Sequence, residues 1–136
     1  MTIRQIKLSQ ADKDHLVKLK RWTKIENWNT LCRWAFCLSL TDRTPPTPID
    51  LPSDSNVEMT WAVFGGDNHE IFLAAITERC ARDGLGTDPE TLNRQFRLHL
   101  HRGIGKLAAP KRIKSISDLV RLASDQSVVE PKAAKR

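Results

Sequence analysis

Basic side chains clustered near the N-terminus are the residues whose type and spacing best suit a chemical role. Residues 1–24 hold seven Lys and Arg against two Asp and Glu, which gives a net charge of +5. Lys and Arg set against phosphates release condensed counterions, so the cluster predicts binding of a polyanion such as nucleic acid. A solvated surface with no ligand is the alternative. The predicted phosphate contacts are Arg4, Lys7, Lys13, Lys18, Lys20, Arg21 and Lys24.

A second basic group lies near residue 100. Arg94, Arg97 and His101 are spaced three and four residues apart, which places them on one side of a helix. Arg102 follows directly. We predict secondary DNA or anion contacts for these four residues.

Catalytic and metal-binding patterns are absent from the sequence. No GxSxG, HExxH or GxxxxGKS motif occurs. His99 and His101 point about 200° apart on a helix and cannot chelate one ion together, so we predict that His99 is a half-buried structural histidine. The sequence predicts a binding protein that is not an enzyme and has no cofactor and no metal site.

The three cysteines, Cys32, Cys37 and Cys80, form no CxxC pair, and their odd number argues against a disulfide framework. Cys32 and Cys37 point about 140° apart on a helix, so they do not converge on one ligand. We predict buried thiols that act as small apolar residues in a reducing compartment.

Charge is unevenly distributed along the 136 residues. Residues 25–105 carry a net charge of −4, and residues 106–136 carry +5. The basic ends suit a polyanion, whereas the acidic middle suits a basic protein partner or none. No run of 18 apolar residues and no signal-peptide core occurs, so we expect a cytoplasmic protein with no membrane contact.

Hydrophobic spacing predicts a mainly α fold with a short N-terminal strand followed by helices. Residues 3–8 alternate as a strand does, and Ser9 caps a helix over 10–23 with Asp12 in the position of the capping-box acid. A second helix runs to about residue 40, capped by Asn27 or Asn29. It is apolar nearly all round, apart from Arg33, which predicts burial on several sides, for example by oligomerisation.

The remaining elements follow from turn residues and caps. Four prolines predict an extended crossover over residues 41–56, and residues 57–64 favour a short helix. A third long helix is predicted to end near Asp83, and a fourth, capped by Thr87, near Leu107. Gly103 marks close helix packing or a bend, and a last short helix begins near Ser117. We predict a helical DNA-binding domain over residues 1–108 and a partly disordered basic extension over 109–136.

The order of strand, helix and helix also suits a ribbon-helix-helix protein. In that fold two copies pair their N-terminal strands, and the resulting ribbon enters the major groove. Gln5 and Lys7 would face outward from the ribbon. The alternative is an extended arm or a dimerisation strand that does not touch DNA.

Several unusual strings resemble the DndE family of DNA sulphur modification proteins. They recur in the family's order over about residues 3–108 and are NWNTLCRWAFCLSL (27–40), PPTP (45–48), SNVEMTWAVFGG (55–66), RCARDGLGTDPETL (79–92) and QFRLHLHRGIGKLA (95–108). The residues after about Ala109 are not explained by the family pattern.

The resemblance implies a role in DNA phosphorothioation, in which sulfur replaces a non-bridging backbone oxygen and which is linked to restriction-modification. It implies a small DNA-binding component that favours nicked duplex, assembles with DndC-like and DndD-like subunits, and forms homo-oligomers, tetramers among them. Two other interpretations stay open from the residues: a protein-interaction scaffold that binds little DNA, and a ribbon-type transcription regulator.

Overall fold

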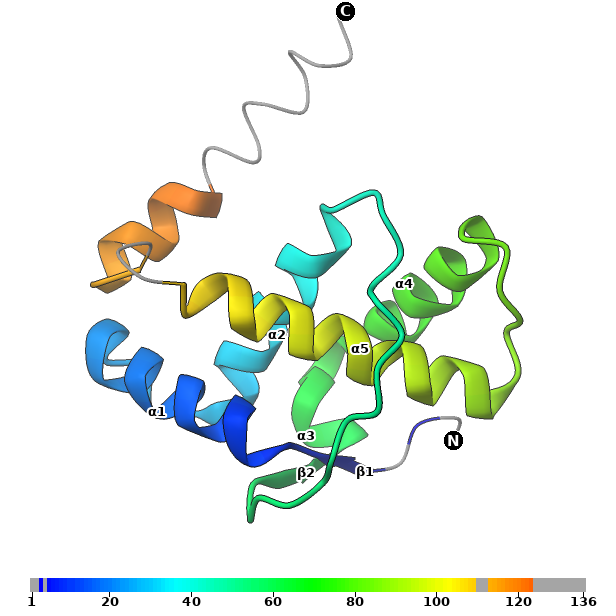
Figure 1. Ribbon diagram of the computed structural model, residues 1–136. Coiled ribbons are helices and arrows are strands. Elements are labelled where there is room, and N and C mark those ends of the chain that lie inside the picture. The colour runs from blue at the N-terminus through cyan, green and yellow to red at the C-terminus, as the bar shows by residue number, and fades with distance from the viewer. Residues whose placement is uncertain (1–2, 4, 110–112, 124–136) are drawn as a thin grey trace, which may run out of the picture.

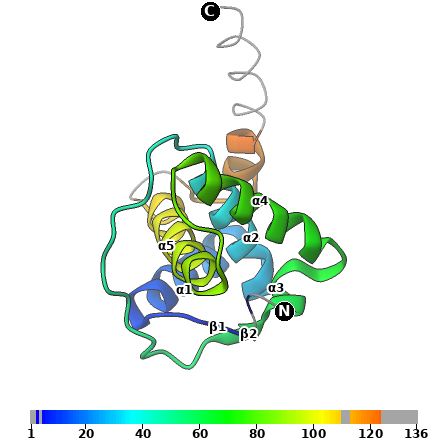
Figure 2. The same cartoon turned by 90° about the vertical axis from the view of Figure 1, so that its right-hand side faces the viewer.

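A long helix, α5 (Pro89–Leu107), crosses the middle of the computed structural model (Figure 1), which describes residues 3, 5–109 and 113–123. Around it lie α1 (Gln10–Thr23), α2 (Trp28–Leu40) and α4 (His69–Arg82). A view along α5 shows α2 and α4 on one side of it and the 41–56 crossover on the other (Figure 2). The fold is mainly helical with one short strand pair, as the sequence predicts.

The closest helix packing is that of α5 on α2. A Cβ added to Gly103 would lie 1.8 Å from the backbone oxygen of Ala35. Only glycine allows the two backbones to approach to this distance. The predicted role of Gly103 in close packing is therefore confirmed.

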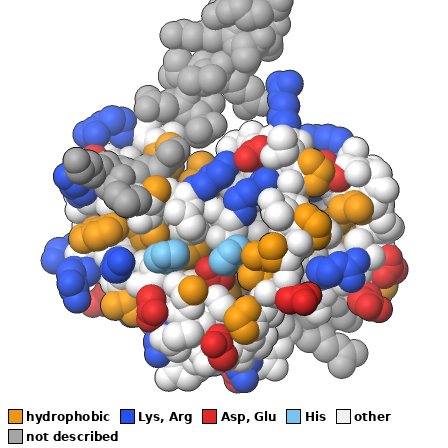
Figure 3. Space-filling view, viewed as in Figure 1, with side chains coloured by type: hydrophobic (Ala, Val, Ile, Leu, Met, Phe, Trp, Pro, Cys, Tyr) orange, Lys and Arg blue, Asp and Glu red, His pale blue; other side chains and the backbone are white. Residues whose placement is uncertain are grey.

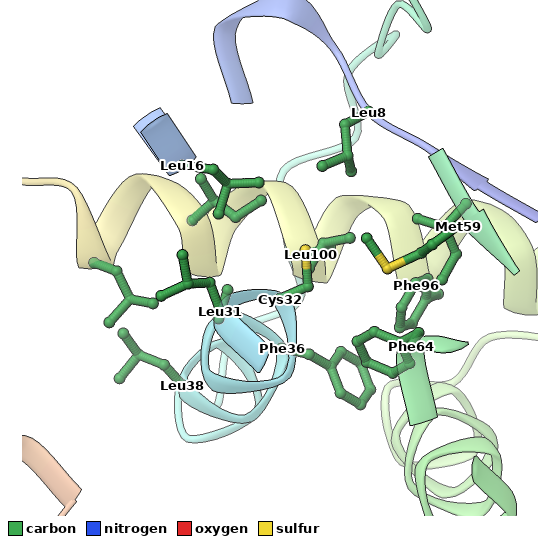
Figure 4. Close-up of a cluster of buried hydrophobic side chains, with 14 of the residues drawn as sticks. Leu8, Leu16, Leu31, Cys32, Phe36, Leu38, Met59, Phe64, Phe96 and Leu100 are labelled. Carbon is green, nitrogen blue, oxygen red and sulfur yellow. The ribbon is translucent and has the colours of Figure 1, made fainter. Parts of the chain in front are cut away.

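Aromatic rings fill the space between these helices. The Phe96 ring centroid lies 5.0 Å from the centroids of Phe36, Phe64 and Trp61. Offset and edge-on contacts of this kind are the arrangements that aromatic pairs prefer. The close-up in Figure 4 shows Phe36 of α2, Phe64 of α3 (Trp61–Gly65) and Phe96 of α5 meeting in this cluster beside Leu100.

The predicted N-terminal strand is present as β1 (Gln5–Lys7), but its partner lies in the same chain. β1 pairs antiparallel with β2 (Glu58–Thr60), with Ile6 opposite Met59. Gln5 and Lys7 are exposed and Ile6 is buried, as the alternation predicts. The pairing differs from the ribbon alternative, in which this strand would pair with a second copy.

Residues 57–64 form a strand followed by a helix, so the prediction of a single short helix was only half right. β2 occupies 58–60, and α3 (Trp61–Gly65) begins directly after it. The hydroxyl of Thr60 accepts a hydrogen bond from the amide of Val63, which starts the helix at residue 61. A 3-10 turn, η1 (Gly66–Asn68), leads into α4.

Helix ends largely follow the predicted caps. The Ser9 hydroxyl accepts from the Asp12 amide at 3.1 Å, whereas Asn27 precedes α2 without a side-chain cap. The predicted cap Thr87 is wrong: Asp88 caps α5 by accepting from the Thr91 amide at 3.1 Å. Pro89 occupies the first helical position, which leaves the residue before it as the cap, and a carboxylate is favourable at a helix N-terminus.

The chain after α5 rejoins the body of the fold. Residues 116–123 are helical, close to the predicted start at Ser117. Ile113 and Leu119 are buried in the main core. The boundary predicted after residue 108 stays a prediction, and the disorder predicted for residues 130–136 lies outside the described residues. No helix in the described ranges is long and apolar enough to cross a membrane.

Candidate nucleic-acid interface

One side of α1 carries most of the predicted phosphate contacts. At 100° per residue, these side chains fall within roughly 160° of the helix circumference. The residues of this surface, called the basic face below, are Lys13, Lys18, Lys20, Arg21 and Lys24. The opposite side buries Leu16, Leu19 and Thr23, so packing on the core turns the basic face toward solvent. Figure 3 shows Lys and Arg side chains gathered at the left-hand edge of the molecule, over α1.

Three cations of the basic face have no partner within the part of the chain that the structure describes. Lys18, Arg21 and Lys24 are exposed, and within the described residues their side chains make no hydrogen bond or ion pair. Lys24 ends α1 in the left-handed conformation, with φ 66°, and its amide still bonds the Lys20 carbonyl. These side chains are free to meet phosphates.

The other two cations of the basic face are partly engaged. The Lys13 ammonium donates to the Asn56 side chain at 2.6 Å. The Lys20 ammonium lies 4.2 Å from the ring centroid of Trp28, a cation–π contact. Both contacts are weak enough at a surface for a phosphate to compete with them.

The first two predicted contacts lie apart from the basic face. Lys7 is exposed on β1 and sits opposite Glu58 in the strand register. Arg4 lies outside the described residues.

A hydrogen bond between His101 and the buried Asp12 anchors α1 against α5. His101 Nδ1 donates to Asp12 Oδ1 at 2.8 Å, and Asp12 is 1% exposed. The hydrogen bond to this carboxylate raises the pKa of His101, against the effect of partial burial. The Asp12 carboxylate therefore points toward α5, away from the cations of the basic face.

Two of the predicted secondary contacts on α5 are instead used to hold the crossover. Arg97 donates to the Ser53 hydroxyl and the Pro52 carbonyl, both at 3.0 Å. Arg102 donates to the Thr44 carbonyl at 2.8 Å. Arg94 is exposed and, among the described residues, makes no side-chain hydrogen bond. Of the four predicted secondary contacts, Arg94 is the one left free for an anion.

Arg79, which the sequence analysis did not single out, lies at the centre of a buried network. It is 3% exposed and bonds the carboxylate of Asp83 at 3.0 Å. Its other nitrogens donate to the carbonyls of Leu40, Asp42 and Thr44. The guanidinium thus satisfies backbone groups at the C-terminal end of α2 that have no helical partner. The signal in the sequence was an arginine between Ile76 and Cys80 on an apolar helix face.

Lys106 and Asp42 extend this network to the surface. The Lys106 ammonium lies 2.8 Å from the Asp42 carboxylate. That hydrogen bond, together with two from Thr44, holds the pKa of Asp42 well below its usual range. The network fixes the start of the crossover against α5.

His99 and Ser39 form a sealed pair between α5 and α2. Ser39 Oγ lies 2.8 Å from His99 Nδ1 and accepts a hydrogen bond from Arg102 Nε at 2.9 Å. The proton of this hydroxyl is thus available to the imidazole nitrogen. Burial, then the charges of Arg79 and Arg102, lower the pKa of His99 to about 4. His99 is 1% exposed, so it is structural, as predicted, and more deeply buried than expected.

The cysteine prediction holds for two of the three thiols. Cys32 and Cys80 are buried, and burial raises the pKa of the Cys32 thiol to about 12. Cys37 is exposed, so its predicted burial is wrong. It lies beside Thr30, Arg33 and Trp34 in a shallow hollow on the outer side of α2. This side of α2 faces away from the core, although its sequence is apolar.

Comparison with protein-family models matches residues 5–115 to "DNA sulphur modification protein DndE". A crystal structure of DndE from Escherichia coli B7A, involved in DNA phosphorothioation modification, is similar with a TM-score of 0.65. It is 22% identical and covers 79% of this chain and 98% of its own. A DndE G21/24K mutant involved in DNA phosphorothioation gives a TM-score of 0.59 at 22% identity, covering 76% of this chain and 95% of its own. At this identity the likeness shows the fold alone, and the search of curated proteins finds no match.

Proposed function

This chain belongs to the DndE family of DNA sulphur modification proteins, and we propose that it is a non-catalytic DNA-binding subunit of a DNA phosphorothioation system. The observation that carries the proposal is the basic face of α1. Its free cations Lys18, Arg21 and Lys24 are exposed, and the helix beneath them is fixed to the core by Asp12. A rigid row of cations on a helix suits the regular spacing of phosphates on a duplex.

Backbone binding of this kind carries no sequence information by itself. We propose that the protein favours nicked duplex, because a nick lowers the cost of distorting the DNA backbone to meet a charged protein surface. The resemblance to known DndE proteins further suggests assembly with DndC-like and DndD-like subunits in the cytoplasm, and homo-oligomers such as tetramers.

The test is a charge reversal on the basic face. Replacing Lys18, Lys20 and Arg21 together with Glu should abolish the gel shift of nicked duplex DNA. Because each phosphate contact contributes about 0.9 to the slope of log affinity against log salt, any residual binding should lose about two to three units of slope. Fluorescence anisotropy over a salt series measures both quantities.

A matched control separates local contact from net charge. Arg43, Arg82 and Arg121 are exposed and lie outside α1. Replacing these three with Glu changes the net charge equally and should leave most of the affinity intact. If the two triple variants bind equally well, α1 is not the phosphate surface.

A protein-interaction scaffold is the second candidate function. It is favoured by the outer side of α2, where Trp34 and the exposed Cys37 line a hollow that is open to solvent. Exposed apolar patches can mark protein–protein contact sites. Wild-type protein that co-purifies with its partner subunits but binds DNA without salt dependence would favour this function over the first.

A further inference from the structure

A small hollow lies where the start of α2 meets β2 and α3. Its volume is about 210 Å³, below the range of about 300–1,000 Å³ typical of drug-sized ligands. Trp28 forms one wall, and Met59 and Val63 supply further apolar surface. We propose that this hollow binds one unpaired nucleobase, with the Trp28 indole as the stacking surface; the inference rests on the proposed function as a DNA-binding protein.

The indole of Trp28 is suited to stacking because it is held firmly and part of it lines the hollow. Trp28 is half-buried and packs against the main core, which fixes its orientation. The Lys20 ammonium lies 4.2 Å from the ring centroid but is not among the residues that line the hollow. When a base stacks on the part of the indole that lines the hollow, Lys20 stays close enough to the ring to meet the phosphate of the same nucleotide. Stacking on aromatic side chains is a common mode of binding for single-stranded DNA.

Polar groups around the hollow match the edges of a base. Asn27 precedes α2 without capping it, and Glu26 and Glu58 are exposed. Within the described residues, none of these three side chains has a hydrogen-bond partner. Asparagine pairs with the donor and acceptor of adenine, and carboxylates accept from exocyclic amino groups. The hollow therefore offers hydrogen bonds that the folded chain does not use.

The charges around the hollow decide which part of a nucleotide enters it. Glu26 and Glu58 line the hollow and repel a phosphate, whereas Lys20 and Lys24 stand on the side of α1. The uncharged base therefore points inward and the backbone follows the basic face. The same lysines repel a basic peptide, which would otherwise suit a pocket with two carboxylates and an indole. The arrangement favours a base over a cationic side chain.

In an intact duplex every base is stacked and paired, so none can reach Trp28 without an unpairing cost. A flap or a frayed end at a nick removes most of that cost. The hollow thus gives a preference for DNA with an unpaired base. This preference does not depend on salt, unlike the binding by the basic face.

The experiment compares three DNAs of equal length: an intact duplex, a nicked duplex with a one-nucleotide flap, and the same flap with an abasic nucleotide. Trp28→Leu should weaken binding of the base-containing flap by about tenfold or more. It should change the affinity for the intact duplex and the abasic flap by less than about twofold. Trp28→Phe, which keeps an aromatic face, should recover most of the loss. A 2-aminopurine flap should show fluorescence quenching with wild-type protein and none with Trp28→Leu.

The control is the same substitution on the outer side of the same helix. Trp34→Leu changes a half-buried tryptophan that lines the other hollow of α2, and it should leave flap binding unchanged. Equal binding of the base-containing and abasic flaps by wild-type protein would overturn the inference. The inference would also be overturned if Trp28→Leu lost the same affinity for all three DNAs, because Trp28 would then only support α1. If wild-type protein bound none of the three DNAs, the proposed function itself would be overturned.

Discussion

Replacing Gly103 with alanine should force α5 away from α2 and destabilise the whole fold. The added Cβ would lie 1.8 Å from the Ala35 carbonyl oxygen and 2.4 Å from its carbon, both backbone atoms. To reach the 3.0 Å below which real Cβ contacts essentially never occur, one helix must retreat by at least about 1.2 Å. No side-chain rotation can relieve a clash with backbone.

The size of the effect follows from what this retreat costs. A gap of about 0.5–1 Å already removes a quarter to a half of the dispersion attraction between facing atoms. Adding a methyl group to a packed core costs about 1–3 kcal/mol, and occasionally more. Alanine returns up to about 1 kcal/mol through its helix propensity. Because the clash is with backbone, we expect a net loss of about 3 kcal/mol, which lowers Tm by roughly 10 °C.

Gly105 provides the matched control two residues further along α5. A Cβ at this position meets nothing within 4 Å. Gly105→Ala should therefore gain about 0.5–1 kcal/mol from helix propensity alone. Urea unfolding followed by circular dichroism measures both variants against wild type. A Gly103→Ala protein that unfolds at the same urea concentration as Gly105→Ala would refute the assignment of Gly103 as the contact that sets helix spacing.

Three further changes test the polar contacts. Arg79→Lys should lose about 3 kcal/mol of unfolding free energy in urea, because a lysine cannot satisfy the carbonyls that the buried guanidinium holds; the exposed Arg82→Lys should stay within about 0.5 kcal/mol. Acid should destabilise the protein through His99, because the pKa of this side chain is lower in the folded state than in the unfolded state. Its contribution to the free energy of unfolding is complete above about pH 6.5 and is lost as the pH falls toward 4. Alkali should act through His101, whose raised pKa gives stability that is complete below about pH 6.5 and is lost as the pH rises through its folded pKa. In Asp12→Asn the urea midpoint should no longer fall as the pH rises between about pH 6 and 8. If the midpoint of this variant depends on pH as in wild type, the pairing of His101 with Asp12 is contradicted.

Most helices of the fold were predictable from the sequence because their signals are local. The cap residue Ser9 and the helical spacing of the apolar residues after it predicted α1 with its observed bounds, Gln10–Thr23. The strand β2 was not predictable in the same way, because its pairing with β1 joins residues more than 50 positions apart. The string VEMTWAVF is apolar enough for either a strand or a helix. Only the presence of β1 decides that residues 58–60 are extended.

For the α5 cations, sequence spacing predicted their side of the helix but not their partners. Arg97 and Arg102 contact the crossover, whose backbone carbonyls carry no residue-specific signal in a sequence. Cys37 was predicted to be buried and is exposed, which shows the same limit of sequence spacing. An apolar string predicts burial, but which side of α2 meets the core depends on where α5 and α4 pack.

The division between engaged and free cations is what makes α1 the stronger candidate for DNA contact. By the number of basic residues alone, α5 and α1 would be similar candidates for DNA contact. On α5, however, Arg94 is the one predicted contact that is free within the described residues. An anion that bound Arg97 or Arg102 would have to break their bonds and release the crossover, which would cost folding free energy. On α1, Lys18, Arg21 and Lys24 have no bonds to break within the described residues. The two basic surfaces therefore have different physical roles: Arg97 and Arg102 of α5 hold the crossover, whereas three cations of the basic face remain available to phosphate.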